Sequence, residues 1–259
     1  MRMKILITND DGYQAKGIHA LAHIMKRFGE VTVVAPKTHH SGMSMAISLG
    51  LRPLGFRDLG IIDGTQWYYL DGTPASCAKF AIDEVFKDSL PDVILSGINH
   101  GSNASTAMWY SGTIGAAREG ALGGVPSIAV SLNNLHEDAD FSVVEQLFPA
   151  IFEKLMANLP KDKILVYNVN FPDLPADQIR GVRSTTQGRE KWVNEFVPVA
   201  PSDRQEGEAY YVMAGDVVPL DDNPENSDNW AEDNGYISIT PQSLDNTDMD
   251  EYRRLLEIF

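Results

Sequence analysis

Residues 4–12 read KILITNDDG, and this stretch decides the fold. Residues 4–8 form a short apolar run typical of a buried strand, and Asp10 and Asp11 follow it just before a turn glycine. An isolated Asp-Asp-Gly is most often only a turn. Two adjacent carboxylates at a buried strand end repel each other, however, and a bound divalent cation would relieve that repulsion. The stretch therefore favours a strand that ends in a metal anchor.

Strand and helix patterns alternate through residues 1–175. Apolar strands are predicted at 4–8, 31–36, 66–70, 91–97, 125–132 and 163–172, and helices at 17–28, 74–87, 111–122 and 140–159, the last interrupted near Pro149. Short apolar strands separated by helices are typical of a mostly parallel sheet that helices cover on both faces. Right-handed crossovers make such a sheet doubly wound, so we expect an α/β fold.

The pattern changes in residues 176–259. Short polar and aromatic strands alternate there with acidic loops, which predicts an antiparallel β-hairpin extension, while about 233–241 is expected to return to the core. The tail, residues 248–259, reads as a short amphipathic helix. Such a helix docks on a partner subunit or packs on its own domain, and the sequence leaves both open.

Composition limits the function classes. The formal net charge of -15 disfavours a nucleic-acid polymer as partner, because the surface repels a phosphate backbone. The single cysteine, Cys77, allows no intrachain disulfide, and we find neither a signal-peptide pattern nor a run of 18 apolar residues. We therefore expect a cytoplasmic protein without membrane association.

Ligands of doubly wound sheets bind outside the carboxyl ends of the strands. Four polar segments follow predicted strands or open a helix there: 9–12, 39–42, 98–103 and 110–113. Each has a simpler interpretation as a turn, a solvated loop or, for Ser111, a helix N-cap. Together they favour a metal-plus-phosphate site, because asparagine and carboxylate oxygens suit Mg²⁺ and a helix N-terminus attracts anions. P-loop, dinucleotide-binding and nucleophile-elbow motifs are missing.

Seven segments occur in an order that resembles the SurE (survival protein E) family: ILITNDDG, VTVVAPKTHHSGMSMAIS, GTPASC, PDVILSGINHGSN, YSGTIGAAREG, NVNFP and GYISITP. That family comprises metal-dependent 5′/3′-nucleotidases, which hydrolyse nucleoside monophosphates. The resemblance spans residues 4 to about 241. It implies a Rossmann-like core, and a C-terminal extension that takes part in forming a homodimer or homotetramer.

The resemblance also implies a set of site residues. One divalent ion per subunit, Mg²⁺ or Mn²⁺, would be held by Asp10, Asp11, Ser41 and Asn99. The substrate phosphate would lie near a second group, with Gly42 offering a close-approaching backbone: Gly42, Asn103, Ser111, Gly112 and Thr113. Asp10 and Asp11 would carry the catalysis. Either a water molecule oriented by Asp10 or Asp10 itself would attack phosphorus, and the missing D-x-D-x-T signature favours water.

Three segments depart from the family pattern: Ser76 stands where members often carry Asp, residues 104–109 replace a Gly-Asp-Asp-like stretch, and residues 242–244 lack a histidine common after the S-I-T-P strand. Trp109 or Tyr110 would stack on a base, although core packing is the commoner role of such aromatics. The base, the 5′ or 3′ preference and the ion stay open. So do two other functions, a non-catalytic metal- and nucleotide-binding stress module and a phosphatase for other small esters or short polyphosphate.

Overall fold

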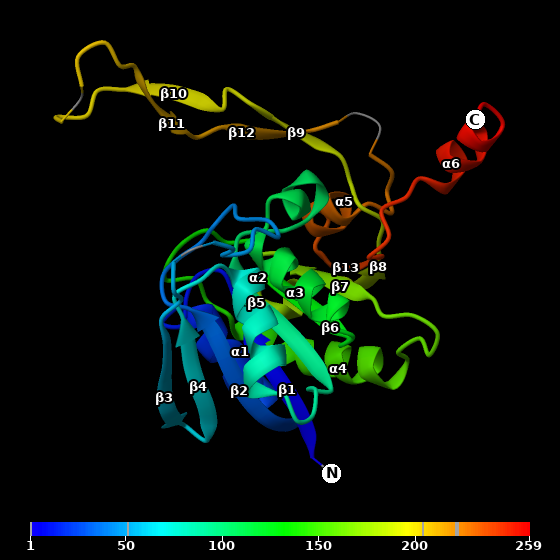
Figure 1. Ribbon diagram of the computed structural model, residues 1–259. Coiled ribbons are helices and arrows are strands. Elements are labelled where there is room, and N and C mark those ends of the chain that lie inside the picture. Colours follow the sequence, from blue (N-terminus) through cyan, green and yellow to red (C-terminus); the bar gives the residue numbers. More distant parts are fainter. Residues whose placement is uncertain (1, 51, 204, 221–222) are drawn as a thin grey trace.

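The computed structural model describes residues 2–50, 52–203, 205–220 and 223–259. Within these residues, nine strands form one sheet in the order β3-β4-β2-β1-β5-β6-β7-β13-β8 (Figure 1). The central pairings β4-β2-β1-β5-β6-β7 are parallel, whereas β3 and β13 run antiparallel to β4 and β7. The doubly wound, mostly parallel α/β fold is thereby confirmed.

The strands and helices of this α/β core have the following bounds: β1 Met3–Thr8, α1 Lys16–Met25, β2 Gly29–Pro36, β3 Phe56–Ile62, β4 Thr65–Leu70, α2 Pro74–Phe80, β5 Val93–His100, α3 Gly112–Leu122, β6 Ser127–Leu132, α4 Ser142–Ala157 and β7 Val166–Phe171. A π-helical turn, Ala81–Val85, extends α2, and a 3-10 turn, Ser105–Trp109, precedes α3. The parallel strands all end at the edge where the polar segments were expected.

Alternate side chains of β1 enter opposite layers of the core. Ile5 and Ile7 pack with α1 and α4, whereas Leu6 packs with α2 on the other face of the sheet. All three side chains are fully buried. This arrangement explains why the strand is apolar at every position, since each face of a parallel sheet is covered by helices.

One local expectation was wrong, and one strand was missed. Helix α4 runs unbroken through Pro149, because the carbonyl of Glu145, which loses its helical donor, belongs to an exposed residue and can be hydrated. Strand β3 was not expected from the sequence. Its residues are largely exposed, and a bulge between Asp58 and Gly60 breaks its pairing with β4, so no clean alternation marks it.

The C-terminal half contributes to the same sheet and also leaves it. Strands β8 (Gly181–Ser184) and β13 (Tyr236–Gln242) close one edge, and the short helix α5 (Asp228–Asp233) packs on β13. Between them a long arm projects from the body (Figure 1), built of β9 (Glu190–Val193) paired with β12 (Asp216–Pro219), and β10 (Phe196–Val199) paired with β11 (Tyr210–Met213). The division of the chain at residue 175 stays a prediction.

Helix α6 (Met249–Leu256) lies apart from the rest of the chain in Figure 1, and none of its residues is buried. Asp248 caps it by accepting hydrogen bonds from the N–H groups of Asp250 and Glu251. Packing of this helix on its own domain is therefore wrong. Among the described residues, no helix is long and apolar enough to cross a membrane.

Candidate active site

The turn after β1 is fixed by Asn9 and Gly12. The Asn9 amide donates to the Gly12 carbonyl at 2.9 Å and accepts from the Gly12 N–H at 3.2 Å. Gly12 has a φ of 97°, a conformation that side chains rarely adopt. The glycine thus lets the chain reverse immediately after two carboxylates, which then stay at the end of the strand.

Asp10 is held at the start of α3. Its side chain is 3% exposed, and the Thr113 hydroxyl donates to its Oδ1 at 2.5 Å. Burial first, and then repulsion from Asp11, raise the pKa of Asp10 from 3.8 to about 6, and the Thr113 hydrogen bond opposes part of that rise. A buried carboxylate beside a second carboxylate is a strong candidate for cation binding.

Gly112 makes this approach of helix and strand end achievable. A Cβ at this position would lie 2.9 Å from the Asp10 Cβ and 3.2 Å from Pro74 Cγ. Any side chain would therefore push α3 away from Asp10.

Asp11 lies between two histidines. Its Oδ1 is 3.2 Å from His39 Nδ1, and its Oδ2 is 3.1 Å from His100 Nδ1. The other ring nitrogen of His39 shares a hydrogen bond of 2.7 Å with the Ser41 hydroxyl. Ser41 is thus connected to Asp11 through His39, and the sequence left the roles of both histidines open.

The loop that carries Ser41 and Gly42 runs along the site edge. His40 N–H donates to the Asp10 carbonyl at 2.7 Å, and Ser44 N–H donates to the Tyr110 carbonyl at 2.8 Å. Ser41 and Gly42 are themselves exposed, and a Cβ on Gly42, whose φ is 73°, would meet nothing within 4 Å. The space beside Gly42 is therefore open to a ligand.

Asn99, near the end of β5, and Asn103, just after it, are both buried. Asn99 donates its amide hydrogens to the carbonyls of Gly101 at 2.8 Å and His100 at 3.2 Å, so Oδ1 is the atom that could bind a cation. Asn103 donates through Nδ2 to the Ser131 hydroxyl at 2.8 Å, which uses one of the two hydrogens on that nitrogen. The second Nδ2 hydrogen of Asn103 can donate to a phosphate oxygen.

The backbone of Asn103 is held by the neighbouring strand β7. Its N–H donates to Asn170 Oδ1 and its carbonyl accepts from Asn168 Nδ2, both at 2.8 Å. Sequence reasoning missed this support. A signal was available, because two asparagines spaced by two in an apolar strand place two amides on one face of the sheet.

The N-terminus of α3 combines a cap with free donors. Ser111 Oγ accepts from the Ile114 N–H at 3.1 Å, which makes it the N-cap, while its own O–H hydrogen stays available. The predicted N-cap and anion-cradle roles are thus compatible. The Thr113 hydroxyl is engaged with Asp10, which leaves its backbone N–H, in the first turn of the helix, for an anion.

The donor set suits a hard cation. Asp10, Asp11, Ser41 and Asn99 offer carboxylate, hydroxyl and amide oxygens, the ligand types that Mg²⁺ and Mn²⁺ prefer. Within the described ranges no group of three or more His, Cys, Asp and Glu side chains forms a metal site, so nitrogen- and sulfur-rich metal centres gain no support. The adjacent carboxylates at the end of β1 fit a divalent ion.

Comparison with known proteins decides the family. A family model described as Survival protein SurE matches residues 5–194. The chain belongs to the SurE family. It is 42% identical over 247 residues to a protein named 5′-nucleotidase SurE from Chlorobium luteolum, covering 95% of this chain and 92% of that protein. A protein of the same name from Bacteroides thetaiotaomicron is 38% identical over 247 residues, covering 94% and 91%.

The fold is shared with a solved SurE structure. The crystal structure of the SurE protein from Aquifex aeolicus matches with a TM-score of 0.81 and 32% identity, covering 98% of each chain. The resemblance to the SurE family inferred from the seven sequence segments is thereby confirmed.

The departures from the SurE pattern have local roles here. Ser76 Oγ accepts from the Ser48 N–H at 2.7 Å, so this residue holds the loop that follows Ser41 and Gly42. Gln242 Oε1 accepts a hydrogen bond from the Arg118 guanidinium, on α3, at 3.1 Å. Trp109 is 45% exposed and stacks over Arg118, so it is not a core residue.

Proposed function

We propose that this chain is a 5′-nucleotidase that hydrolyses nucleoside 5′-monophosphates to nucleoside and phosphate. The observation that carries the proposal is the contact of Asp10, which adjoins Asp11, with the N-terminus of α3, in a chain about 40% identical to proteins named 5′-nucleotidase SurE. In this arrangement the two carboxylates would bind a cation beside a helix end that would bind an anion. Hydrolysis of 3′-monophosphates is a second activity for the same site.

The proposed metal ligands are Asp10, Asp11, Ser41 and Asn99, and one divalent ion per subunit, Mg²⁺ or Mn²⁺, would bind there. When bound, the ion would neutralise charge on a phosphoryl oxygen and so lower the barrier to its displacement. The Thr113 hydroxyl fixes Oδ1 of Asp10, which leaves Oδ2 to face the ligand.

The proposed phosphate cradle consists of the Ser111 hydroxyl, the free N–H groups of Gly112 and Thr113, and the second amide hydrogen of Asn103. These donors would hold the phosphoryl oxygens and place phosphorus opposite Asp10. Gly42 adds an open backbone edge to the same space. Asp10 Oδ2 would orient the attacking water and accept its proton.

The test is phosphate release from 5′-AMP by metal-stripped protein, with and without Mg²⁺ or Mn²⁺, beside an Asp10→Asn variant. We expect release that requires metal and disappears in the variant. Circular dichroism checks that the variant is folded. We expect it to fold, because a neutral amide is less costly to bury than a carboxylate. No release from folded wild-type protein with either ion would contradict the proposal, and nucleotide binding without turnover would instead support a binding module.

Three further comparisons refine the proposal. Release from 3′-AMP, from generic phosphate esters and from short polyphosphate ranks the substrate classes. If rapid-quench experiments trapped a phosphorylated protein, the nucleophile would be Asp10 and not water. Titration with each ion separates the Mg²⁺ and Mn²⁺ preferences.

We also propose that the chain forms a homodimer or homotetramer through the arm and α6. Large apolar side chains are exposed on both, including Phe196 and Met213 on the arm and Leu256 on α6, at 63%, 70% and 63%. Exposed apolar surface of this extent is typical of subunit contacts. Sedimentation of the full chain measures the oligomer, and cell fractionation tests the proposed cytoplasmic location.

A further inference from the structure

A cavity of about 290 Å³ lies beside His100, a direct neighbour of Asp11. His100 belongs to both the cavity and the candidate active site, because it lines the cavity while its Nδ1 contacts Asp11 at 3.1 Å. Ser102, on the same loop as Asn99 and Asn103, also lines it. A molecule whose phosphate lies at the start of α3 could therefore extend into this cavity, which is near the lower end of the usual size range for ligand pockets.

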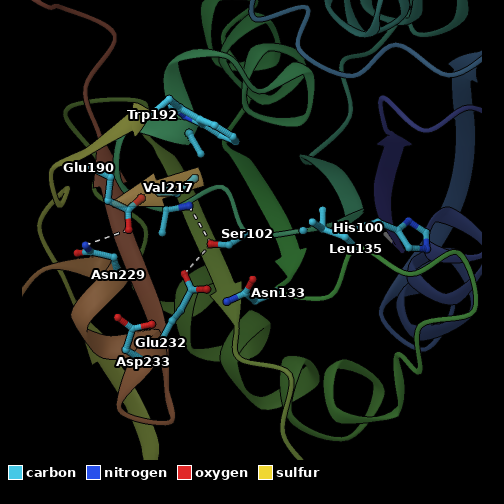
Figure 2. Close-up of a pocket in the computed structure, with 13 residues that line it drawn as sticks. His100, Ser102, Asn133, Leu135, Glu190, Trp192, Val217, Asn229, Glu232 and Asp233 are labelled. Atoms are coloured by element: carbon cyan, nitrogen blue, oxygen red, sulfur yellow. Dashed lines mark hydrogen bonds between the residues drawn. The ribbon is translucent and has the colours of Figure 1, made fainter. Parts of the chain in front are cut away.

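The cavity contains a buried carboxyl group with an unused oxygen. Glu232, from α5, is 5% exposed, and its Oε1 accepts a hydrogen bond from the Ser102 hydroxyl at 2.9 Å. Its Oε2 has no hydrogen-bond partner in the described part of the chain. Figure 2 shows this carboxyl group between Ser102 and the other lining side chains. A buried acceptor without a donor is costly, so the arrangement fits a ligand that supplies a hydrogen.

The charge of the cavity wall selects which part of a substrate enters it. Glu190 and Asp233 line the same cavity as Glu232. Burial raises the pKa of all three carboxyl groups, and above those raised pKa values they are ionised and repel a phosphate, whereas uncharged hydroxyl groups can donate to them. The phosphate of a nucleotide would accordingly stay at the α3 end, and its sugar would face the acidic wall.

An aromatic surface completes the cavity. Trp192, on β9 of the arm, lines it and is 40% exposed, and Figure 2 shows its indole on the upper side, away from Glu232. A nucleobase stacks readily on an exposed indole. The wall thus offers a hydroxyl acceptor and a stacking surface.

We propose that this cavity binds the nucleoside of the substrate, with a ribose hydroxyl donating to Glu232 Oε2 and the base stacked on Trp192. This inference rests on the proposed nucleotidase function and identifies the residues that would distinguish a nucleotide from other phosphate esters. Trp192 replaces Trp109 and Tyr110 as the expected stacking residue.

The experiment measures kcat and KM for 5′-AMP, 2′-deoxy-AMP, 3′-deoxy-AMP and p-nitrophenyl phosphate in wild type, Glu232→Gln and Trp192→Leu. Glutamine keeps an oxygen for Ser102 and replaces the unused oxygen with an NH₂ group. We expect Glu232→Gln to lower kcat/KM for AMP about tenfold, mainly by raising KM. The kcat/KM for p-nitrophenyl phosphate should change less than about twofold. For one of the two deoxynucleotides, the one that lacks the donating hydroxyl, kcat/KM should be the same in Glu232→Gln and wild type.

Trp192→Leu should lower kcat/KM about tenfold for all three nucleotides and leave p-nitrophenyl phosphate unaffected. Trp109→Leu is the matched comparison, because Trp109 is a similarly exposed tryptophan outside this cavity, and it should keep the wild-type preference for AMP. Equal losses on AMP and p-nitrophenyl phosphate, or a selective loss in Trp109→Leu alone, would overturn the inference. Wild-type protein that hydrolyses none of the four esters would instead overturn the proposed function.

Discussion

The hydrogen bond between Thr113 and Asp10 joins α3 to the end of β1, and its removal gives a prediction with a defined size. Thr113 is fully buried, Asp10 is 3% exposed, and their oxygens are 2.5 Å apart. A hydrogen bond to a buried charged group contributes about 1.5–3 kcal/mol. Thr113→Val should therefore lower the free energy of unfolding of the metal-free protein by about that amount at pH 8, where Asp10 is ionised.

Urea unfolding of the metal-stripped protein measures this loss. Thr8→Val is the matched control, because Thr8 is an equally buried threonine whose hydroxyl has no partner among the described residues. Its substitution should change stability by less than about 0.5 kcal/mol or increase it. Thr113→Ser, which keeps the hydroxyl, should retain most of the stability lost in Thr113→Val.

A double-mutant cycle with Asp10→Asn separates the charge from the shape of the side chain. A hydrogen bond between neutral groups contributes only about 0.5–1.5 kcal/mol, so Thr113→Val should cost less in the Asp10→Asn background. The added methyl group crowds position 10 similarly in both backgrounds. An equal cost in both, or no cost in the wild type, would refute the role given to this hydrogen bond.

The remaining predictions concern the metal, the helix contact and a buried acid. Mn²⁺ at a hundred times its dissociation constant should stabilise the wild type by about 2.7 kcal/mol in thermal unfolding, and Asp11→Asn should remove that gain. Gly112→Ala places a Cβ 2.9 Å from the Asp10 Cβ, so phosphate release should fall about a hundredfold; an unchanged rate would exclude α3 from the site. Burial raises the pKa of Glu232 well above 4.5, so the folded protein holds this proton at a pH where the unfolded chain has lost it. The stability that this proton contributes is therefore present below about pH 4.3 and is lost as pH rises through the folded pKa. In urea titrations, the stability of Glu232→Gln relative to wild type should accordingly increase with pH. A stability difference that stays constant with pH would contradict this.

Much of the core could be predicted because its signals are local. The apolar strand at residues 4–8, the Asp-Asp-Gly after it and the Ser-Gly-Thr at the start of α3 each lie within a few residues. Strand β3 and the path of α4 through Pro149 could not be predicted in the same way. The first is an exposed edge strand with a bulge, and the second depends on which face of the helix meets water.

The contacts of the site depend on long-range packing. Thr113 meets Asp10 across 103 positions, and Glu232 meets Ser102 across 130. Helix α5 has only six residues, too few to form a stable helix without tertiary contacts, and it is held by packing on β13. Its acidic segment reads as a loop in the sequence, which is why Glu232 was missed.

The sequence by itself determined the parallel α/β core and the strand end that carries Asp10 and Asp11, because apolar periodicity and turn chemistry act between near neighbours. Only the tertiary structure decided what those carboxylates touch, and that residues of the arm and α5 line a cavity next to His100. The physical reason is that strand order, helix docking and the burial of Glu232 are settled by contacts between distant segments, whose closure no local pattern encodes.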